Sequence, residues 1–172
     1  MTVTADLLKR RFPGLMGRFE RGELETLLNV LVPIEASSGK ELHHCGNPAD
    51  SLYLIWEGSL LLSMESDGEE IPLGNLGPGQ HIGSVAVIEP GPAPTTVVVT
   101  EPSTLLRLDH SGFLVLRTIY PRLGGHFLQA LSLDLAERLR SYEEGMARRT
   151  QPPSNPEEFA RLYRPLMGIK TG

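Results

Sequence analysis

One stretch decides the fold of this chain. Residues 46–58 read Gly-Asn-Pro-Ala-Asp-Ser-Leu-Tyr-Leu-Ile-Trp-Glu-Gly, and 18 residues after Gly58 the chain reads Leu76-Gly-Pro-Gly79. Gly83 follows and opens a short apolar run. Glycines at such points allow the chain to reverse, often with positive φ. The apolar runs between them have the length of β-strands, so the stretch predicts strands joined by tight turns.

The same alternation of strands and turns extends from Val32 to Leu108. Short strands with turn signals about every 8–12 residues are typical of a β-sandwich or a jelly-roll barrel. Asp67-Gly68 lies between two apolar runs and predicts a hairpin. The sequence therefore predicts a mainly β fold, and the high content of glycine and proline argues against a helical bundle.

Helical patterns precede the β region. Thr4 can cap a first helix, which Pro13-Gly14 should end. A second helix is predicted around Glu23 to Val30, where leucines recur at helical spacing.

More helices are predicted after the β region. A short one starts at Ser111, and Pro121 interrupts it; a long one follows from about Arg122 to Arg148. The apolar stripe of the long helix consists of Leu123, Phe127, Leu131, Leu135 and Leu139, with Leu128 and Met146 nearby.

A last, amphipathic helix is predicted over residues 156–167. Asn155 can cap it, Pro156 suits its first position, and Pro165 should end it early. Two roles are open for this segment: docking on its own domain, or binding a groove on a partner.

These patterns divide the chain into four segments. They are an N-terminal helical segment (1–31), a β-roll core (32–120), a long C-terminal helix (121–149), and a linker with a short tail helix (150–172).

Charge is distributed unevenly along the chain. No lysine or arginine lies between Lys40 and Arg107, whereas nine acidic residues do. A nucleic-acid-binding surface needs clustered cations, so the β core is not expected to bind nucleic acid. The one cysteine, Cys45, permits no intrachain disulfide, and no apolar run has the length of a membrane span or a signal peptide. We expect a cytoplasmic protein.

The segment 46–58 and the run from Leu76 to Val97 together resemble the cyclic nucleotide-binding domain family. This family includes the sensor domains of the catabolite activator proteins and of the regulatory subunits of protein kinase A. The resemblance covers about residues 14–142 and implies a β-jelly roll with N-terminal helices and a long C-terminal helix. It also implies that residues 82–97 correspond to the family's phosphate-binding cassette.

The resemblance places the candidate binding site in this cassette. Its residues are Gly83, Ser84, Val85, Ala86, Ala93, Thr95 and Thr96. The family uses a glutamate for the ribose 2′-hydroxyl and an arginine for the cyclic phosphate, and the residue after the arginine offers a backbone N–H. In this chain Ser84 and Ala93 stand in the places of the glutamate and arginine, and Pro94 has no N–H.

These replacements remove contacts to one ligand. Loss of an Arg–phosphate pair costs about 2–5 kcal/mol, which corresponds to about two to three decades of affinity. We therefore expect cyclic nucleotide binding of the family type to be lost.

Other kinds of site are not expected. His43 and His44 are adjacent and should point to opposite faces of a strand, which is unsuited to a shared metal. No catalytic constellation or P-loop is visible, so neither an enzyme nor a metal or cofactor site is predicted. After Arg149 only 23 residues remain, too few for a helix-turn-helix unit.

The sequence thus predicts a stand-alone regulatory or scaffold module that acts through protein–protein contacts. The leucine stripe of the 122–148 helix has two possible roles: about half of it can pack on the β core of its own chain, or it can form a dimer seam. A homodimer through this helix is the expected assembly, since charged residues flank the stripe as in a coiled-coil seam. The alternative is a small-ligand sensor that binds a cyclic mono- or dinucleotide, or another metabolite, by a non-standard set of contacts.

Overall fold

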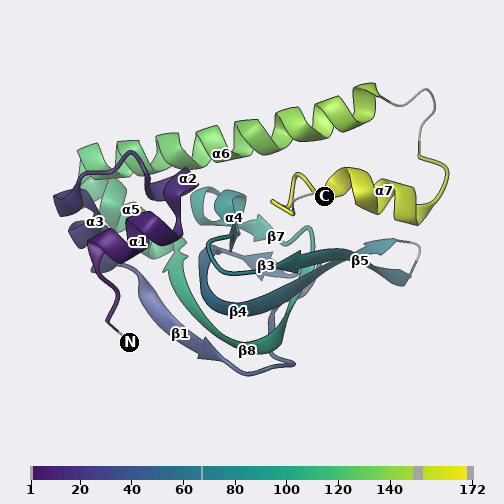
Figure 1. Ribbon diagram of the computed structural model, residues 1–172, viewed down its shortest axis with the longest axis horizontal. Helices are drawn as coiled ribbons and strands as arrows, with labels where there is room; N and C mark the ends of the chain where they lie inside the picture. The colour runs from purple at the N-terminus through teal and green to yellow at the C-terminus, as the bar shows by residue number, and fades with distance from the viewer. Residues whose placement is uncertain (1, 67, 149–152, 170–172) are drawn as a thin grey trace.

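The computed structural model describes residues 2–66, 68–148 and 153–169. The chain forms an antiparallel β-roll, with helices at one end and along one side (Figure 1). The central sheet follows the order β1-β8-β4-β5, with β2 paired to β8 and β6 to β4. Its strands are β1 (Val32–Ala36), β2 (Glu41–His43), β4 (Ser51–Ser66), β5 (Glu69–Leu76), β6 (His81–Ile82) and β8 (Thr96–Asp109). The predicted mainly β jelly-roll class is confirmed.

The two long strands β4 and β8 form the backbone of the roll. They pair antiparallel from Ser51–Asp109 at one end to Ser63–Thr96 at the other, with register shifts near Glu57 and Ser59. The predicted hairpin is present, because β4 and β5 pair up to Ser66 and Glu69. A separate two-stranded sheet joins β3 (Pro48–Ala49) to β7 (Gly91–Pro92).

Three short helices, α1 (Ala5–Arg11), α2 (Pro13–Met16) and α3 (Arg21–Leu28), lie at the N-terminal end. The side chain of Thr4 caps α1 by accepting a hydrogen bond from the N–H of Leu7. Pro13 ends α1 as expected. It also occupies the first position of α2, a helix that the sequence did not predict. Proline suits this position because a backbone N–H there would have no hydrogen-bond partner within the helix.

The helix after the roll, α5 (His110–Ile119), begins one residue earlier than predicted. Asp109 caps it, with Oδ1 accepting a hydrogen bond from the N–H of Gly112 at 2.8 Å, so Ser111 lies inside the helix. Pro121 then opens the long helix α6 (Pro121–Ala147), which runs along the roll (Figure 1).

The first half of the stripe on α6 packs within the chain, which is one of the two roles that the sequence left open for it. Leu123, Phe127 and Leu131 are buried in a core shared with the N-terminal helices and α5. Those three side chains therefore pack within the chain, while Leu139 remains exposed. The apolar line left on the surface of α6 consists of Leu128, Leu139 and Met146.

The C-terminal segment docks on its own domain. Helix α7 (Pro156–Tyr163) lies between α6 and β5 (Figure 1). Ala160 and, beyond the helix, Ile169 are buried in the same core as the interior of the roll. Of the two roles left open for residues 156–167, the structure shows docking in cis, and the helix ends before Pro165 as expected.

Candidate functional site

Gly83 sets the position of the cassette against the central sheet. It has a φ of +94°, and a Cβ atom built on it would lie 2.0 Å from the carbonyl oxygen of Ser51 in β4. Any side chain would therefore clash with backbone. Glycine allows the short helix α4 (Ser84–Ile88) to start directly beside β4.

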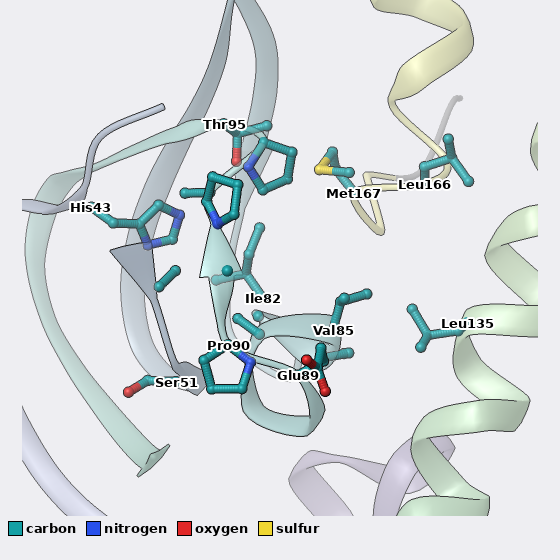
Figure 2. A pocket seen from close by; sticks show the side chains of 18 of the residues that line it. His43, Ser51, Ile82, Val85, Glu89, Pro90, Thr95, Leu135, Leu166 and Met167 are labelled. Atoms are coloured by element: carbon teal, nitrogen blue, oxygen red, sulfur yellow. The ribbon is translucent and has the colours of Figure 1, made fainter. Parts of the chain in front are cut away.

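A cavity of about 480 Å³ lies beside the cassette. Its walls come from α4, from the loop around β7, from His43 of β2, and from Leu135 and Arg138 of α6. Leu166 and Met167 of the C-terminal segment complete it (Figure 2). Small and apolar residues dominate the lining, and the volume is within the range of about 300–1,000 Å³ that small-molecule pockets occupy.

The structure brings most of the predicted site residues together. Residues 83–86, Ala93 and Thr95 all line the cavity. Thr96 does not: its hydroxyl accepts a hydrogen bond from the N–H of Cys45 at 3.0 Å. Thr96 begins β8, where consecutive side chains point to opposite faces, so only one of the two adjacent threonines can reach the cavity.

Ala93 is held by its own backbone. Its N–H donates to the carbonyl of Asn47, and its carbonyl accepts from the N–H of Gly46, both at 2.8 Å. The side chain is 3% exposed and forms part of the cavity wall. The position that the resemblance assigns to the phosphate-binding arginine thus lies in the cavity wall and carries only a methyl group.

Ser84 has an unusual environment. It is 3% exposed, and its hydroxyl oxygen is buried without a hydrogen-bond partner among the described residues. A buried polar atom without a partner costs about 1–3 kcal/mol of stability. Ser84 is also one of the residues that line the cavity.

Arg138 lines the cavity but is not among the site residues that the sequence predicts. Its Nε atom lies 2.8 Å from Oδ2 of Asp134, and its Nη2 atom lies 2.8 Å from Nε2 of His81. The same Asp134 oxygen is 3.1 Å from His81 Nε2. The spacing of Asp134 and Arg138 on one helix face could have indicated their pairing, but not that the pair lies beside the cassette.

The pKa of Asp134 reflects this cluster. Burial acts to raise it, but the hydrogen bond and charge of His81 together with the guanidinium of Arg138 outweigh that effect, and the pKa is lowered. Asp134 therefore stays ionised and keeps Arg138 neutralised. Arg138 is the only lysine or arginine among the described residues that line the cavity, and the lining also includes the carboxylate of Glu89.

His43 and His44 point apart, as the strand geometry predicts. His43 lines the cavity, whereas His44 is exposed and lies 3.3 Å from Glu41. Burial lowers the pKa of His43, and Glu41 opposes this shift less strongly. Across the described residues, no group of three or more His, Cys, Asp or Glu side chains is arranged to hold a metal ion.

Comparison with known proteins agrees with this geometry. The sequence model of the cyclic nucleotide-binding domain matches residues 33–119, about half of the chain. The chain belongs to the cyclic nucleotide-binding domain family. The members of this family are regulatory binding domains.

Among the described helices, none combines the length and apolar character that a bilayer span requires.

Individual relatives show how far the likeness extends. A cAMP-dependent protein kinase type II regulatory subunit from Drosophila melanogaster is 31% identical over 78 residues, which are 45% of this chain and 21% of that protein. The chain thus matches only about a fifth of the length of that relative.

Two solved structures share the fold. The N-terminal domain of a transcriptional regulator from Streptomyces coelicolor is 27% identical, with a TM-score of 0.65 over 79% of this chain and 92% of that one. A cyclic nucleotide-binding domain from Methylobacillus flagellatus is 21% identical, with a TM-score of 0.74 over 86% and 87% of the two chains.

The unpartnered hydroxyl of Ser84 gives a prediction for stability. We expect Ser84→Ala to raise the free energy of unfolding by about 1 kcal/mol, because it removes a buried polar atom that lacks a partner. Ser103→Ala is the matched control, since the equally buried Ser103 hydroxyl accepts from the N–H of Ser59 and donates to the carbonyl of Glu101. The free energy of unfolding of Ser103→Ala, measured by urea titration, should be lower than that of the wild type by about 1 kcal/mol. Equal destabilisation of both variants would contradict the environment assigned to Ser84.

The lowered pKa of His43 gives a prediction for pH. The unfolded chain takes up a proton near pH 6.5 while the folded chain does not, so stability should fall as the pH drops below that value. We expect the wild type to lose more free energy of unfolding between pH 7.5 and pH 5.5 than His43→Gln does. Equal losses in denaturant titrations at the two pH values would show that burial of His43 does not shift its pKa.

Proposed function

We propose that this chain is a regulatory module that acts through protein contacts and does not bind cyclic nucleotides with the affinity typical of its family. The observation that carries the proposal is the state of Arg138: it is the one arginine at the cavity among the described residues, and Asp134 already neutralises it. The single cysteine, which permits no intrachain disulfide, suits a cytoplasmic setting for such a module.

Among the described residues that line the cavity, the one cation that a cyclic phosphate would meet is Arg138, which is already paired. Ala93 offers no charge, and Pro94 offers no N–H. Arg138 Nε is 2.8 Å from the Asp134 carboxylate, so a phosphate that bonds to the other N–H groups of Arg138 would compete with that carboxylate for a single positive charge. Glu89 adds a second negative charge at the cavity.

The same reasoning applies to the alternative of a sensor for cyclic mono- or dinucleotides with non-standard contacts. Such a site needs other cations in place of the missing arginine. A cyclic dinucleotide has two phosphates, so it needs a cation for each of them. No other lysine or arginine lines the cavity among the residues that the structure describes.

Calorimetric titration tests the proposed loss of binding. We expect no heat of binding for cyclic AMP or cyclic GMP at high micromolar concentration. The double variant Ser84→Glu with Ala93→Arg restores the two groups that the family uses, and it should gain about two to three decades of affinity. A micromolar isotherm with the wild type would overturn the proposal.

For the protein contact, we propose a homodimer through the exposed line on α6. Leu128, Leu139 and Met146 are 37%, 48% and 38% exposed and are separated by 11 and 7 residues, which places them on one face of the helix. A two-fold axis lets the same face meet its own copy. This line lies beside the buried stripe, so dimerisation would leave the chain's own core intact.

Molar mass measured by light scattering tests the dimer. Leu139→Glu with Met146→Glu should convert a dimer to a monomer, because it places charges in the proposed seam. Leu133→Glu is the control, because Leu133 is 43% exposed and lies on another face of the same helix. The molar mass of this variant should remain that of a dimer. A wild-type chain that is monomeric at high concentration would exclude the seam.

A further inference from the structure

The cavity survives although the groups for a cyclic phosphate are missing. It has about 480 Å³, and apolar atoms make up most of its surface. Leu135 of α6 and Val85 of α4 both project at its open side (Figure 2). Small lining residues such as Ala86 and Ala93 leave this space unfilled.

The C-terminal segment 164–169 forms one wall of the cavity by specific contacts. The side-chain amide of Gln80 donates to the carbonyl of Gly168 at 3.0 Å. Gly168 has a φ of +77°, and a Cβ atom there would lie 2.9 Å from the Arg138 guanidinium carbon. These contacts hold Leu166 and Met167 against the cavity, which adds apolar surface that β-roll and cassette alone do not supply.

The charges around the cavity do not favour an ionic ligand. Arg138 is paired with Asp134, so a carboxylate already offsets its positive charge. Glu89 is the one carboxylate among the described residues that line the cavity, and Glu89 is exposed to solvent. His43 is neutral at neutral pH because burial lowers its pKa.

Among the polar side chains of the lining, Ser84 stands out because its polar atom is buried and unpaired. Ser84 is 3% exposed, and its hydroxyl has no partner among the described residues. Native proteins rarely leave such a group unsatisfied, and a ligand atom is one way to satisfy it. A single hydrogen bond in an apolar cavity orients a ligand without requiring it to carry charge.

We propose that the cavity binds an uncharged, mainly apolar small molecule, one polar atom of which bonds to the Ser84 hydroxyl, with residues 164–169 as its closing wall. The inference rests on the proposed loss of cyclic nucleotide binding. It adds the chemical class of the ligand that this module senses.

The fluorescent probe N-phenyl-1-naphthylamine tests the proposal with the full chain. The probe is neutral and apolar, carries one N–H, and brightens when it leaves water. We expect saturable binding of one probe per chain. Ala86→Phe should abolish it by filling the cavity, whereas Ala147→Phe, at the exposed end of α6, should leave it unchanged.

Ser84→Ala is a second variant, in case Ala86→Phe fails to fold. It should weaken probe binding about fivefold, the effect of one neutral hydrogen bond, while the protein stays folded. Probe binding that is equal in the wild type, Ala86→Phe and Ser84→Ala overturns the inference.

Competition separates this inference from the proposed function. Cyclic AMP at high micromolar concentration should not displace the probe. Displacement by cyclic AMP would overturn the proposed loss of nucleotide binding. If the probe does not bind in the cavity and cyclic AMP gives no heat of binding in calorimetry, only the proposal of an apolar ligand is overturned.

Discussion

The antiparallel pairing of β4 and β8 is the constraint on which the rest of the molecule depends. At one end, where Ser51 pairs with Asp109, β8 leads directly into α5, and Leu52 and Leu108 join the core of the helical end. At the other end, Leu60, Leu62, Val97 and Val99 form the interior of the roll. The two cores therefore share the same two strands, and the cassette is positioned by its attachment to β4.

That attachment fixes the walls of the cavity by backbone contacts. Gly83 fits against the carbonyl of Ser51, and the backbone of Ala93 is bonded to Gly46 and Asn47. Both contacts are made by backbone, so they do not depend on the side chains at positions 84 and 93. Substitution at those positions can change the chemistry of the cavity and leave its walls in place.

The electrostatics of the cavity follow from a cluster that surrounds it. His81, Asp134 and Arg138 come from β6 and α6, and their mutual contacts occupy the charge of the arginine. A cation near the cassette is thus part of the structure rather than free for a ligand. The C-terminal segment then covers this cluster, since Gly168 packs against the guanidinium of Arg138.

Much of this architecture was accessible from the sequence. The glycines at turns, the hairpin at Gly68 and the capping residues Thr4 and Asn155 act within a few residues of chain, so their local patterns predict structure directly. The cassette residues 83–86 and Ala93 were also found, because a short continuous motif contains them. Thr96 was placed in the site as well, since sequence alone did not show which of two adjacent threonines faces inward.

Long-range packing decided what remained. The leucine stripe of α6 predicts a buried face, but only the tertiary structure shows that Leu123, Phe127 and Leu131 pack on the chain's own helices. Arg138 and Met167 reach the cavity from segments more than 40 residues after the cassette, and nothing local connects them to it. The sequence by itself determined the family and the missing phosphate partners, because both reside in contiguous motifs. The tertiary structure decided that the cavity is mainly apolar, that Arg138, the one arginine in its described lining, is paired with Asp134, and that the tail forms one of its walls, because these properties arise from side chains that meet only in the folded chain.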